Sequence, residues 1–224
     1  MNKKGQRFLL VAILVLPVLW GIFNFLVKPV AIEMPYYGHK TVTKTGDTIF
    51  QTVEDFSFVN QDGLTITQDS LKNKISVVNF FFTSCNGTCP KMNTSLMYLA
   101  ERFEESPKIQ LLSHTVNPER DSVATLKKYK FNRGWAVYDN WHFLTGNKKA
   151  LYNMAEYSYL AIADGKSKEE FIHSDNIILV DGSGHIRGIF DGMGGNTEMK
   201  VIEDAIKVLI IESNNNAARE KEGK

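Results

Sequence analysis

The feature that most constrains this chain is an apolar strand pattern that runs directly into two cysteines. Residues 75–83 read Ile-Ser-Val-Val-Asn-Phe-Phe-Phe-Thr, which is typical of a central strand buried on both faces. Cys85 and Cys89 follow, and Pro90 suits the first turn of a helix, where a missing N–H costs nothing. Apolar residues then recur at helical spacing, at Met92, Leu96, Leu99, Ala100 and Phe103. The sequence therefore predicts a strand that delivers two thiols to a helix N-terminus.

Strands and helices alternate on both sides of this unit. Two short strands are expected within residues 56–66, around a turn at Asp62 and Gly63. Further strands are expected at 109–116 and 141–144, and helices after a cap at Asp121 or Ser122 and over about 148–157. Residues 173–180 and 185–190 read as a hairpin, and the last helix carries Ile202, Ala205, Ile206 and Leu209 on one face. This order predicts an α/β, thioredoxin-like fold with an N-terminal transmembrane helix.

The N-terminal segment predicts the compartment. Lys3, Lys4 and Arg7 precede residues 8–27, which carry no charge and are long enough to cross a bilayer as a helix. Basic residues before such a run favour a cytoplasmic N-terminus. We therefore expect a single-pass membrane anchor, with the rest of the chain on the extracytoplasmic (periplasmic) side.

A cleaved signal peptide is the alternative interpretation of this segment. Its apolar region is usually shorter and ends in a small-x-small cleavage site, which residues 27–33 do not offer. No cysteine follows the run, so a lipoprotein anchor is not expected at that point. Both interpretations export the domain. The expected organisation is an anchor over 1–27, a linker over 28–46, a thioredoxin-like domain over 47–211 and a disordered polar tail over 212–224.

Composition narrows the function classes. The formal net charge is +1, so no strong field favours nucleic acid or an acidic substrate. The chain has only two cysteines, too few for a disulfide-stapled scaffold. One close pair leaves two interpretations open, which are a small structural disulfide and a chemically active thiol pair.

The position of the pair favours a chemically active thiol pair over a structural disulfide. A helix N-terminus carries partial positive charge and stabilises a thiolate, the form that binds metals and attacks disulfides. Redox thioredoxins use Cys-x-x-Cys, whereas Cys85 and Cys89 have three residues between them, with Gly87 allowing an unusual turn. Two soft thiolates suit Cu(I) and also Zn(II), and an imidazole would extend the site to Cu(II). Of the five histidines, His173 has the best position because it opens a hairpin strand; the others are His39, His114, His142 and His185.

Together these residues resemble the SCO/SenC family. The resemblance rests on Phe82-Thr83-Ser84-Cys85-x-x-x-Cys89-Pro90, on residues 117–121 (Asn-Pro-Glu-Arg-Asp), and on a histidine opening a strand that ends in Val180-Asp181. It covers about residues 50–211. The resemblance implies that Cys85, Cys89 and His173 bind copper. It also implies that the protein helps to assemble the CuA centre of cytochrome c oxidase, with the CuA-bearing subunit as its partner.

Two positions depart from the family pattern. The family loop usually begins with Asp, where this chain has Asn117, and an acid commonly precedes the ligand histidine, where this chain has Ile172 with Asp175 nearby. A carboxylate next to a ligand histidine often orients it. The second departure therefore bears on the strength of Cu(II) binding.

Four functions compete on this sequence. The leading one is a copper metallochaperone, and the second is a thiol–disulfide oxidoreductase that reduces target cysteines before metallation and needs only Cys85 and Cys89. A peroxidase using Thr83 and Arg120 beside one activated cysteine is less favoured by the cysteine spacing. A structural disulfide in an exported domain is the fourth.

Overall fold

The computed structural model describes residues 13–21, 33–161 and 174–222. The chain divides into two compact units, Met1–Glu33 and Met34–Lys224. In the first unit, residues 13–21 form a helix. Within the described ranges no helix is long and apolar enough to cross a membrane. Residues 8–12 and 22–27 of the predicted span lie outside those ranges, so the transmembrane helix stays a prediction.

The second unit is built on a sheet in the order β4-β3-β7-β6-β5-β8-β9. Its central strands β5 (Ile75–Phe81), β6 (Ile109–Thr115) and β7 (Trp141–Thr145) run parallel. Antiparallel strands complete both edges, and these are β3 (Ser57–Asn60), β4 (Thr65–Thr67), β8 (Asn176–Val180) and β9 (Ile186–Asp191). Short 3-10 turns follow β4 and α3, over Gln68–Leu71 and Trp135–Val137.

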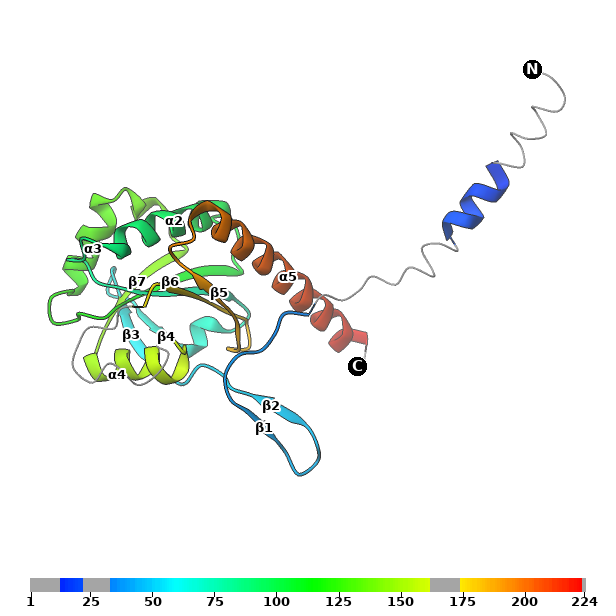
Figure 1. Ribbon diagram of the computed structural model, residues 1–224, viewed down its shortest axis with the longest axis horizontal. Helices are drawn as coiled ribbons and strands as arrows, with labels where there is room; N and C mark the ends of the chain where they lie inside the picture. Colours follow the sequence, from blue (N-terminus) through cyan, green and yellow to red (C-terminus); the bar gives the residue numbers. More distant parts are fainter. Residues whose placement is uncertain (1–12, 22–32, 162–173, 223–224) are drawn as a thin grey trace, which may run out of the picture. The chain divides into compact units, whose positions relative to one another are not determined.

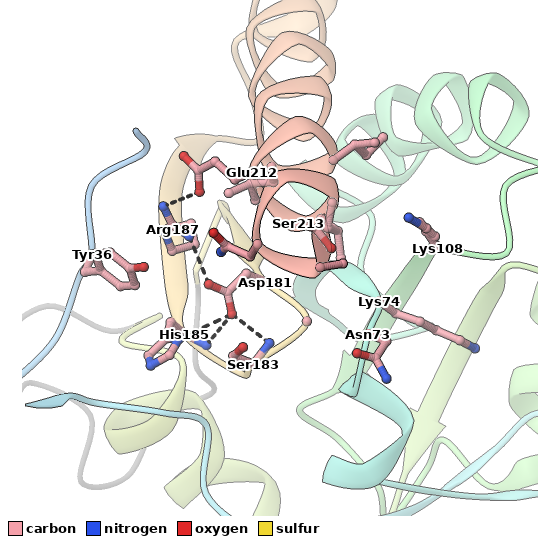
Figure 2. Close-up of a pocket in the computed structure, with 16 residues that line it drawn as sticks. Tyr36, Asn73, Lys74, Lys108, Asp181, Ser183, His185, Arg187, Glu212 and Ser213 are labelled. Atoms are coloured by element: carbon pink, nitrogen blue, oxygen red, sulfur yellow. Dashed lines mark hydrogen bonds and ion pairs between the residues drawn. The ribbon is translucent and has the colours of Figure 1, made fainter. Parts of the chain in front are cut away.

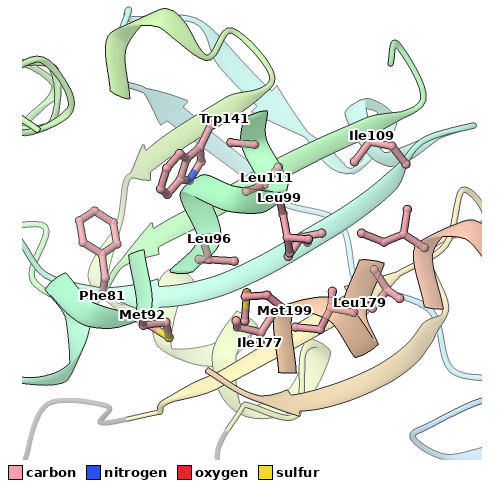
Figure 3. Packing of buried hydrophobic residues seen from close by; sticks show 14 of the residues in the cluster. Phe81, Met92, Leu96, Leu99, Ile109, Leu111, Trp141, Ile177, Leu179 and Met199 are labelled. Carbon is pink, nitrogen blue, oxygen red and sulfur yellow. The ribbon is translucent and has the colours of Figure 1, made fainter. Parts of the chain in front are cut away.

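Helices cover both faces of the sheet, which is why every residue of β5 is buried. One face packs against α2 (Thr88–Arg102), α3 (Val123–Asn132) and α5 (Gly195–Glu222), through a core that includes Val77, Leu96 and Ile206 (Figures 1 and 3). The other face packs against α4 (Lys148–Asn153) and the π-helical turn Met154–Ser158. Alternate residues of β5 point to opposite faces of the sheet. The strand that leads to the cysteines therefore packs into the hydrophobic core on each face.

The elements expected from the sequence are largely found. The strands around Asp62, the strand–helix unit at the cysteines, and the hairpin of β8 and β9 are confirmed. The predicted helix over 148–157 is also found, although its second half is π-helical.

Two expected boundaries differ from the structure. Helix α5 continues to Glu222, through residues expected to be a disordered tail. Glu212 in that stretch forms an ion pair with Arg187, a tertiary contact that composition alone does not reveal. A hairpin of β1 (Lys40–Val42) and β2 (Thr48–Phe50) begins inside the expected linker 28–46. Its turn is closed by the Thr43 N–H, which donates to the Asp47 carbonyl at 2.8 Å.

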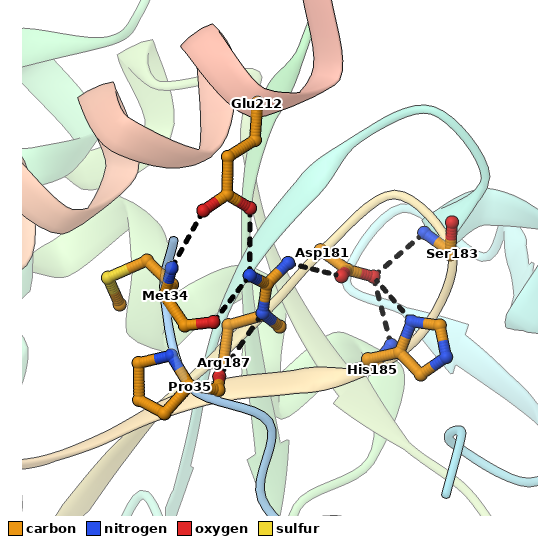
Figure 4. A network of polar contacts seen from close by, with 7 residues as sticks. All are labelled: Met34, Pro35, Asp181, Ser183, His185, Arg187 and Glu212. Carbon is orange, nitrogen blue, oxygen red and sulfur yellow. Dashed lines mark hydrogen bonds and ion pairs between the residues drawn. The ribbon is translucent and has the colours of Figure 1, made fainter. Parts of the chain in front are cut away.

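Arg187 fastens the beginning of the second unit to the sheet and to α5 (Figure 4). Its guanidinium donates to the carbonyl oxygens of Met34 and Pro35 and to the carboxylates of Asp181 and Glu212. The side chain is only 4% exposed, so these acceptors replace water around a buried charge. Met34 itself donates its N–H to Glu212 at 2.7 Å.

Candidate metal and redox site

The two cysteines lie at the point where β5 passes into α2. Cys85 is in the connecting loop and half-buried, whereas Cys89 is in the first turn of α2 and 7% exposed. Both are free thiols. The N-cap of α2 is Gly87, which supplies no side-chain acceptor to the first N–H groups of the helix. Those N–H groups are therefore available to a sulfur.

Cys85 takes that acceptor role. Burial by itself raises the pKa of Cys85, but hydrogen bonds from the Cys89 thiol and from the backbone N–H groups of Gly87, Thr88 and Cys89 outweigh it. The net pKa of Cys85 is lowered. Such bonds favour the charged thiolate, as expected at a helix N-terminus.

Cys89 has the opposite environment. Burial first, and then the hydrogen bond with Cys85, raises the pKa of Cys89 to about 12. The two thiols titrate as a pair, with one proton held at Cys89 while Cys85 is the thiolate. The site thus pairs one thiolate, the form that attacks disulfides and binds metals, with one buried thiol that would have to lose its proton before it could do either.

The Cys85 loop is anchored through Thr83. The Thr83 N–H and hydroxyl both donate to the buried carboxylate of Asp121. This use of the hydroxyl weighs against the peroxidase interpretation, which needs Thr83 to support an activated cysteine. Arg120, the other residue of that interpretation, is exposed.

A pocket of about 300 Å³ lies beside Cys89 and brings a distant segment to the site. Its lining combines the end of β5 and the start of α2 with Ser174 and Asp175, the two residues before β8. Gly192 holds that segment in place, because its N–H donates to the Asp175 carbonyl at 2.7 Å. A Cβ at Gly192 would come within 2.4 Å of that carbonyl oxygen and 2.6 Å of the Met92 sulfur, so only glycine permits this approach.

His173 lies outside the described residues, immediately before Ser174 in the sequence. No group of three His, Cys, Asp or Glu side chains that could hold a metal is found in the part of the chain that the structure describes. Ile172 also lies outside that part. The loop that begins with Asn117 uses the backbone of that residue, whose N–H donates to Thr115 Oγ1 and whose carbonyl accepts from the Asp121 N–H.

The other histidines do not line the pocket beside Cys89. His114 is fully buried in β6 among the rings of Phe58, Phe80 and Tyr159, and burial lowers its pKa to about 3. Burial likewise lowers the pKa of His142 to about 4. His39 lies just before β1 and is exposed.

A second hollow lies at the other end of β5 (Figure 2). It is lined by residues that include Lys74 and Ile75 at the start of the strand, the paired Asp181 and Arg187, and His185. The cysteines come after the last residue of β5. The length of the strand therefore separates this hollow from the thiols.

The fold and the thiol pair together define a class, that of α/β proteins with a thioredoxin-like Sco fold and a Cys-x-x-x-Cys pair at a helix N-terminus. A family model described as SCO1/SenC matches residues 45–209. The chain belongs to the SCO1/SenC family, whose members are involved in cytochrome c oxidase assembly.

Relatives and solved structures agree with this assignment. The SCO1 protein homolog of Bacillus subtilis (strain 168) is 30% identical over 161 residues, covering 70% of this chain and 83% of the relative. A SCO1/SenC family lipoprotein from Bacillus anthracis str. Ames is 28% identical with a TM-score of 0.63, covering 71% of this chain and 95% of that structure.

Two further solved structures are of Sco proteins. BsSco, described as a member of the Sco family of cytochrome c oxidase assembly proteins with a disulfide switch, is 30% identical with a TM-score of 0.60, covering 71% of this chain and 93% of that one. Yeast Sco1 with copper bound shares the fold, at 22% identity and a TM-score of 0.55, covering 70% and 89%.

Proposed function

We propose that this chain is a copper-binding metallochaperone for assembly of the CuA centre of cytochrome c oxidase. The observation that carries the proposal is the pair of thiols at one helix N-terminus, Cys85 poised as thiolate and Cys89 beneath it, in a member of the SCO1/SenC family. Soft thiolates suit Cu(I), and two of them are enough to hold it. Copper is the cargo of such a protein, so it must be bound tightly enough to be carried and released to a partner.

His173 is the proposed third ligand. It is bonded to Ser174, which lines the same pocket as Cys89, and consecutive Cα atoms are about 3.8 Å apart across a trans peptide. The Asp175 carbonyl is held by Gly192, which limits how far this end of the segment can move from α2. A neutral imidazole added to two thiolates is a donor set that suits Cu(II).

A thiol–disulfide oxidoreductase is the second candidate, and the asymmetry of the pair favours it. A nucleophilic thiol with a lowered pKa beside a buried, protonated partner is the arrangement that attacks a disulfide and then resolves it. In this role the protein would reduce the cysteines of the receiving subunit before copper arrives. The chemistry needs no histidine ligand.

The proposed location is the extracytoplasmic side of the membrane, with residues 8–27 as a single-pass anchor and the CuA-bearing subunit as the partner. The basic residues before the uncharged run support this orientation. The description of the Bacillus anthracis relative as a lipoprotein supports membrane association.

Copper spectra of the reduced full-length protein in detergent test the proposal. Wild type loaded with Cu(II) should show a sulfur-to-copper charge-transfer band and nitrogen coupling in its electron spin resonance spectrum. His173→Ala should lose the nitrogen coupling and bind Cu(II) weakly, while Cu(I) binding by the two thiolates persists. The matched control is His39→Ala, which removes an exposed histidine and should behave as wild type.

Two outcomes would overturn this assignment. If His173→Ala keeps the nitrogen coupling, His173 is not the ligand. If wild type forms no stable copper–thiolate species but rapidly reduces a disulfide substrate, with or without His173, the oxidoreductase replaces the chaperone.

A further inference from the structure

We propose that Asp121 is a positioning residue that holds the Cys85 loop where the two thiols can meet. The proposal deepens the proposed function, because it rests on Cys85 and Cys89 acting as a pair. Asp121 lies in the loop before α3 and touches neither sulfur in any contact of the described residues. Its effect would pass through Thr83, the second residue before Cys85.

The carboxylate of Asp121 is fully buried and satisfied by three donors from two strand ends. The Thr83 N–H donates to Oδ2 at 3.0 Å, and the Thr83 hydroxyl donates to Oδ1. The Thr115 hydroxyl donates to Oδ2 at 2.5 Å. Thr83 follows β5 and Thr115 ends β6, so one carboxylate links the C-terminal ends of two parallel strands.

Asp121 is itself held rigidly. The backbone N–H groups of Arg120 and Asp121 donate to the Asn117 carbonyl, at 3.1 and 2.9 Å. The Asn117 N–H returns to Thr115 Oγ1 at 3.0 Å. The Thr115 hydroxyl therefore contacts both ends of the loop 117–121. These bonds close the loop and fix the position of the Asp121 carboxylate.

The buried position of the Asp121 carboxylate is not explained by capping of α3. The N-cap of α3 is Ser122, whose hydroxyl accepts from the Thr125 N–H at 3.3 Å. A buried carboxylate is costly to keep unless its hydrogen bonds are made. Here two of the three bonds come from Thr83, at the start of the loop that carries Cys85, and the third comes from Thr115.

The hydrogen bonds between Asp121 and Thr83 set the position of Cys85 relative to Cys89. Cys89 is fixed in the first turn of α2, which packs on the sheet through residues such as Met92 and Leu96. Cys85 lies in the loop, where its N–H donates to the Phe82 carbonyl at 3.2 Å. With Thr83 released from Asp121, the loop gains freedom, and the effective concentration of one thiol at the other falls.

The test is the equilibrium between the dithiol and the disulfide, measured against dithiothreitol for full-length variants in detergent. In that exchange the protein S–S bond forms as the S–S bond of oxidised dithiothreitol breaks, and two electrons and two protons pass to the dithiothreitol. Asp121→Ala should shift this equilibrium toward the dithiol by about tenfold. Asp121→Asn should recover most of the loss, because its oxygen can accept from the Thr83 N–H and the Thr115 hydroxyl while its NH₂ donates to Thr83 Oγ1.

Glu203→Ala is the matched control. Glu203 is a buried carboxylate on α5 with its own bonding partners, toward the end of α2 remote from Cys89. Its loss should lower stability without moving the dithiol equilibrium. If Asp121→Ala does not fold, Thr83→Val keeps the backbone bond, removes the hydroxyl bond, and should shift the equilibrium by about threefold.

The outcomes separate this proposal from the proposed function. If wild type binds copper and the folded Asp121 and Thr83 variants keep the wild-type dithiol equilibrium, Asp121 is merely structural and the positioning role is overturned. If Glu203→Ala shifts the equilibrium as much as Asp121→Ala, general destabilisation explains the effect and the positioning role is again overturned. If wild type binds no copper but the variants shift as expected, the positioning role stands while the chaperone falls.

Discussion

Cys85 accepts hydrogen bonds from the first turn of the helix in which Cys89 is buried. The pKa of Cys85 is therefore lowered, whereas burial raises the pKa of Cys89. The two cysteines should therefore react in a fixed order, Cys85 before Cys89. Any partner thiol, disulfide or metal ion meets Cys85 first, because Cys89 is the more deeply buried of the two.

The first prediction concerns this order of reaction. With reduced protein at pH 7, iodoacetamide should modify Cys85 at least about 100-fold faster than Cys89, because only the thiolate reacts. Mass spectrometry of the digested protein measures the two rates. The Cys89→Ala variant should show a higher pKa for Cys85, because it removes the thiol that donates a hydrogen bond to it. Equal labelling of both cysteines would contradict the assigned asymmetry.

The second prediction concerns Gly192. A methyl group there would meet the Asp175 carbonyl and the Met92 sulfur, so Gly192→Ala should lower the free energy of unfolding by about 1–3 kcal/mol. With His173 as the proposed third ligand, Gly192→Ala should also weaken Cu(II) binding, because it displaces Ser174 and Asp175, the residues that follow His173. Gly146→Ala is the control, since its Cβ would meet the Phe58 ring at 2.7 Å, and neither Gly146 nor Phe58 lines the pocket beside Cys89. Equal losses of Cu(II) affinity in both variants would argue against a specific role for Gly192.

The third prediction concerns acid stability through Glu203. Hydrogen bonds from Lys207 first, and also from Tyr98 on α2, hold the pKa of this carboxyl far below its usual range. A lowered folded-state pKa adds stability above the unfolded-state value of about 4.3, and this stability is lost as pH falls through the folded-state value.

Glu203→Gln should therefore cost about 1–2 kcal/mol at pH 7, measured by urea unfolding. The difference from wild type should shrink below about pH 4. A difference that stays constant down to pH 2 would show that the charge of Glu203 contributes no stability.

The fourth prediction concerns His114. Burial lowers its pKa to about 3, so the folded protein resists a proton that the unfolded chain accepts below about pH 6.5. Stability is then lost as pH falls from about 6.5 toward 3, by about 2 kcal/mol at pH 5. His114→Phe should remove this loss, while the exposed control His39→Phe should keep it. Parallel stability curves for wild type and His114→Phe between pH 7 and 5 would refute the assignment.

Part of this architecture could be predicted because it is local in sequence. The run of residues 75–83, the cysteine spacing and the helical periodicity after Pro90 lie within one short segment, and they predict the strand, the thiol pair and its helix N-terminus. The Asp62 turn and the hairpin of β8 and β9 are likewise signalled by neighbouring residues. The family resemblance rests on this segment together with residues 117–121 and the histidine that opens the strand ending in Val180-Asp181.

The remainder depends on residues that are far apart in the chain. Nothing near Asp121 indicates that its carboxylate bonds Thr83, and nothing near Glu212 indicates its pairing with Arg187. The extension of α5 is hard to predict for the same reason, because a polar segment resembles a disordered tail when its tertiary partner is not known. The hairpin of β1 and β2 is not signalled by the sequence, because the prolines and glycines of residues 28–46 are typical of a linker, whereas Gly46 has a φ of +90° and forms its turn.

The Arg187 network has a practical consequence for protein production. The family match begins at residue 45, but Met34 and Pro35 supply two of the carbonyl oxygens that surround the buried guanidinium. An expression truncation cut at the family boundary would remove those acceptors, and it would also delete β1. A secreted or crystallisable version of this domain should therefore start no later than Glu33.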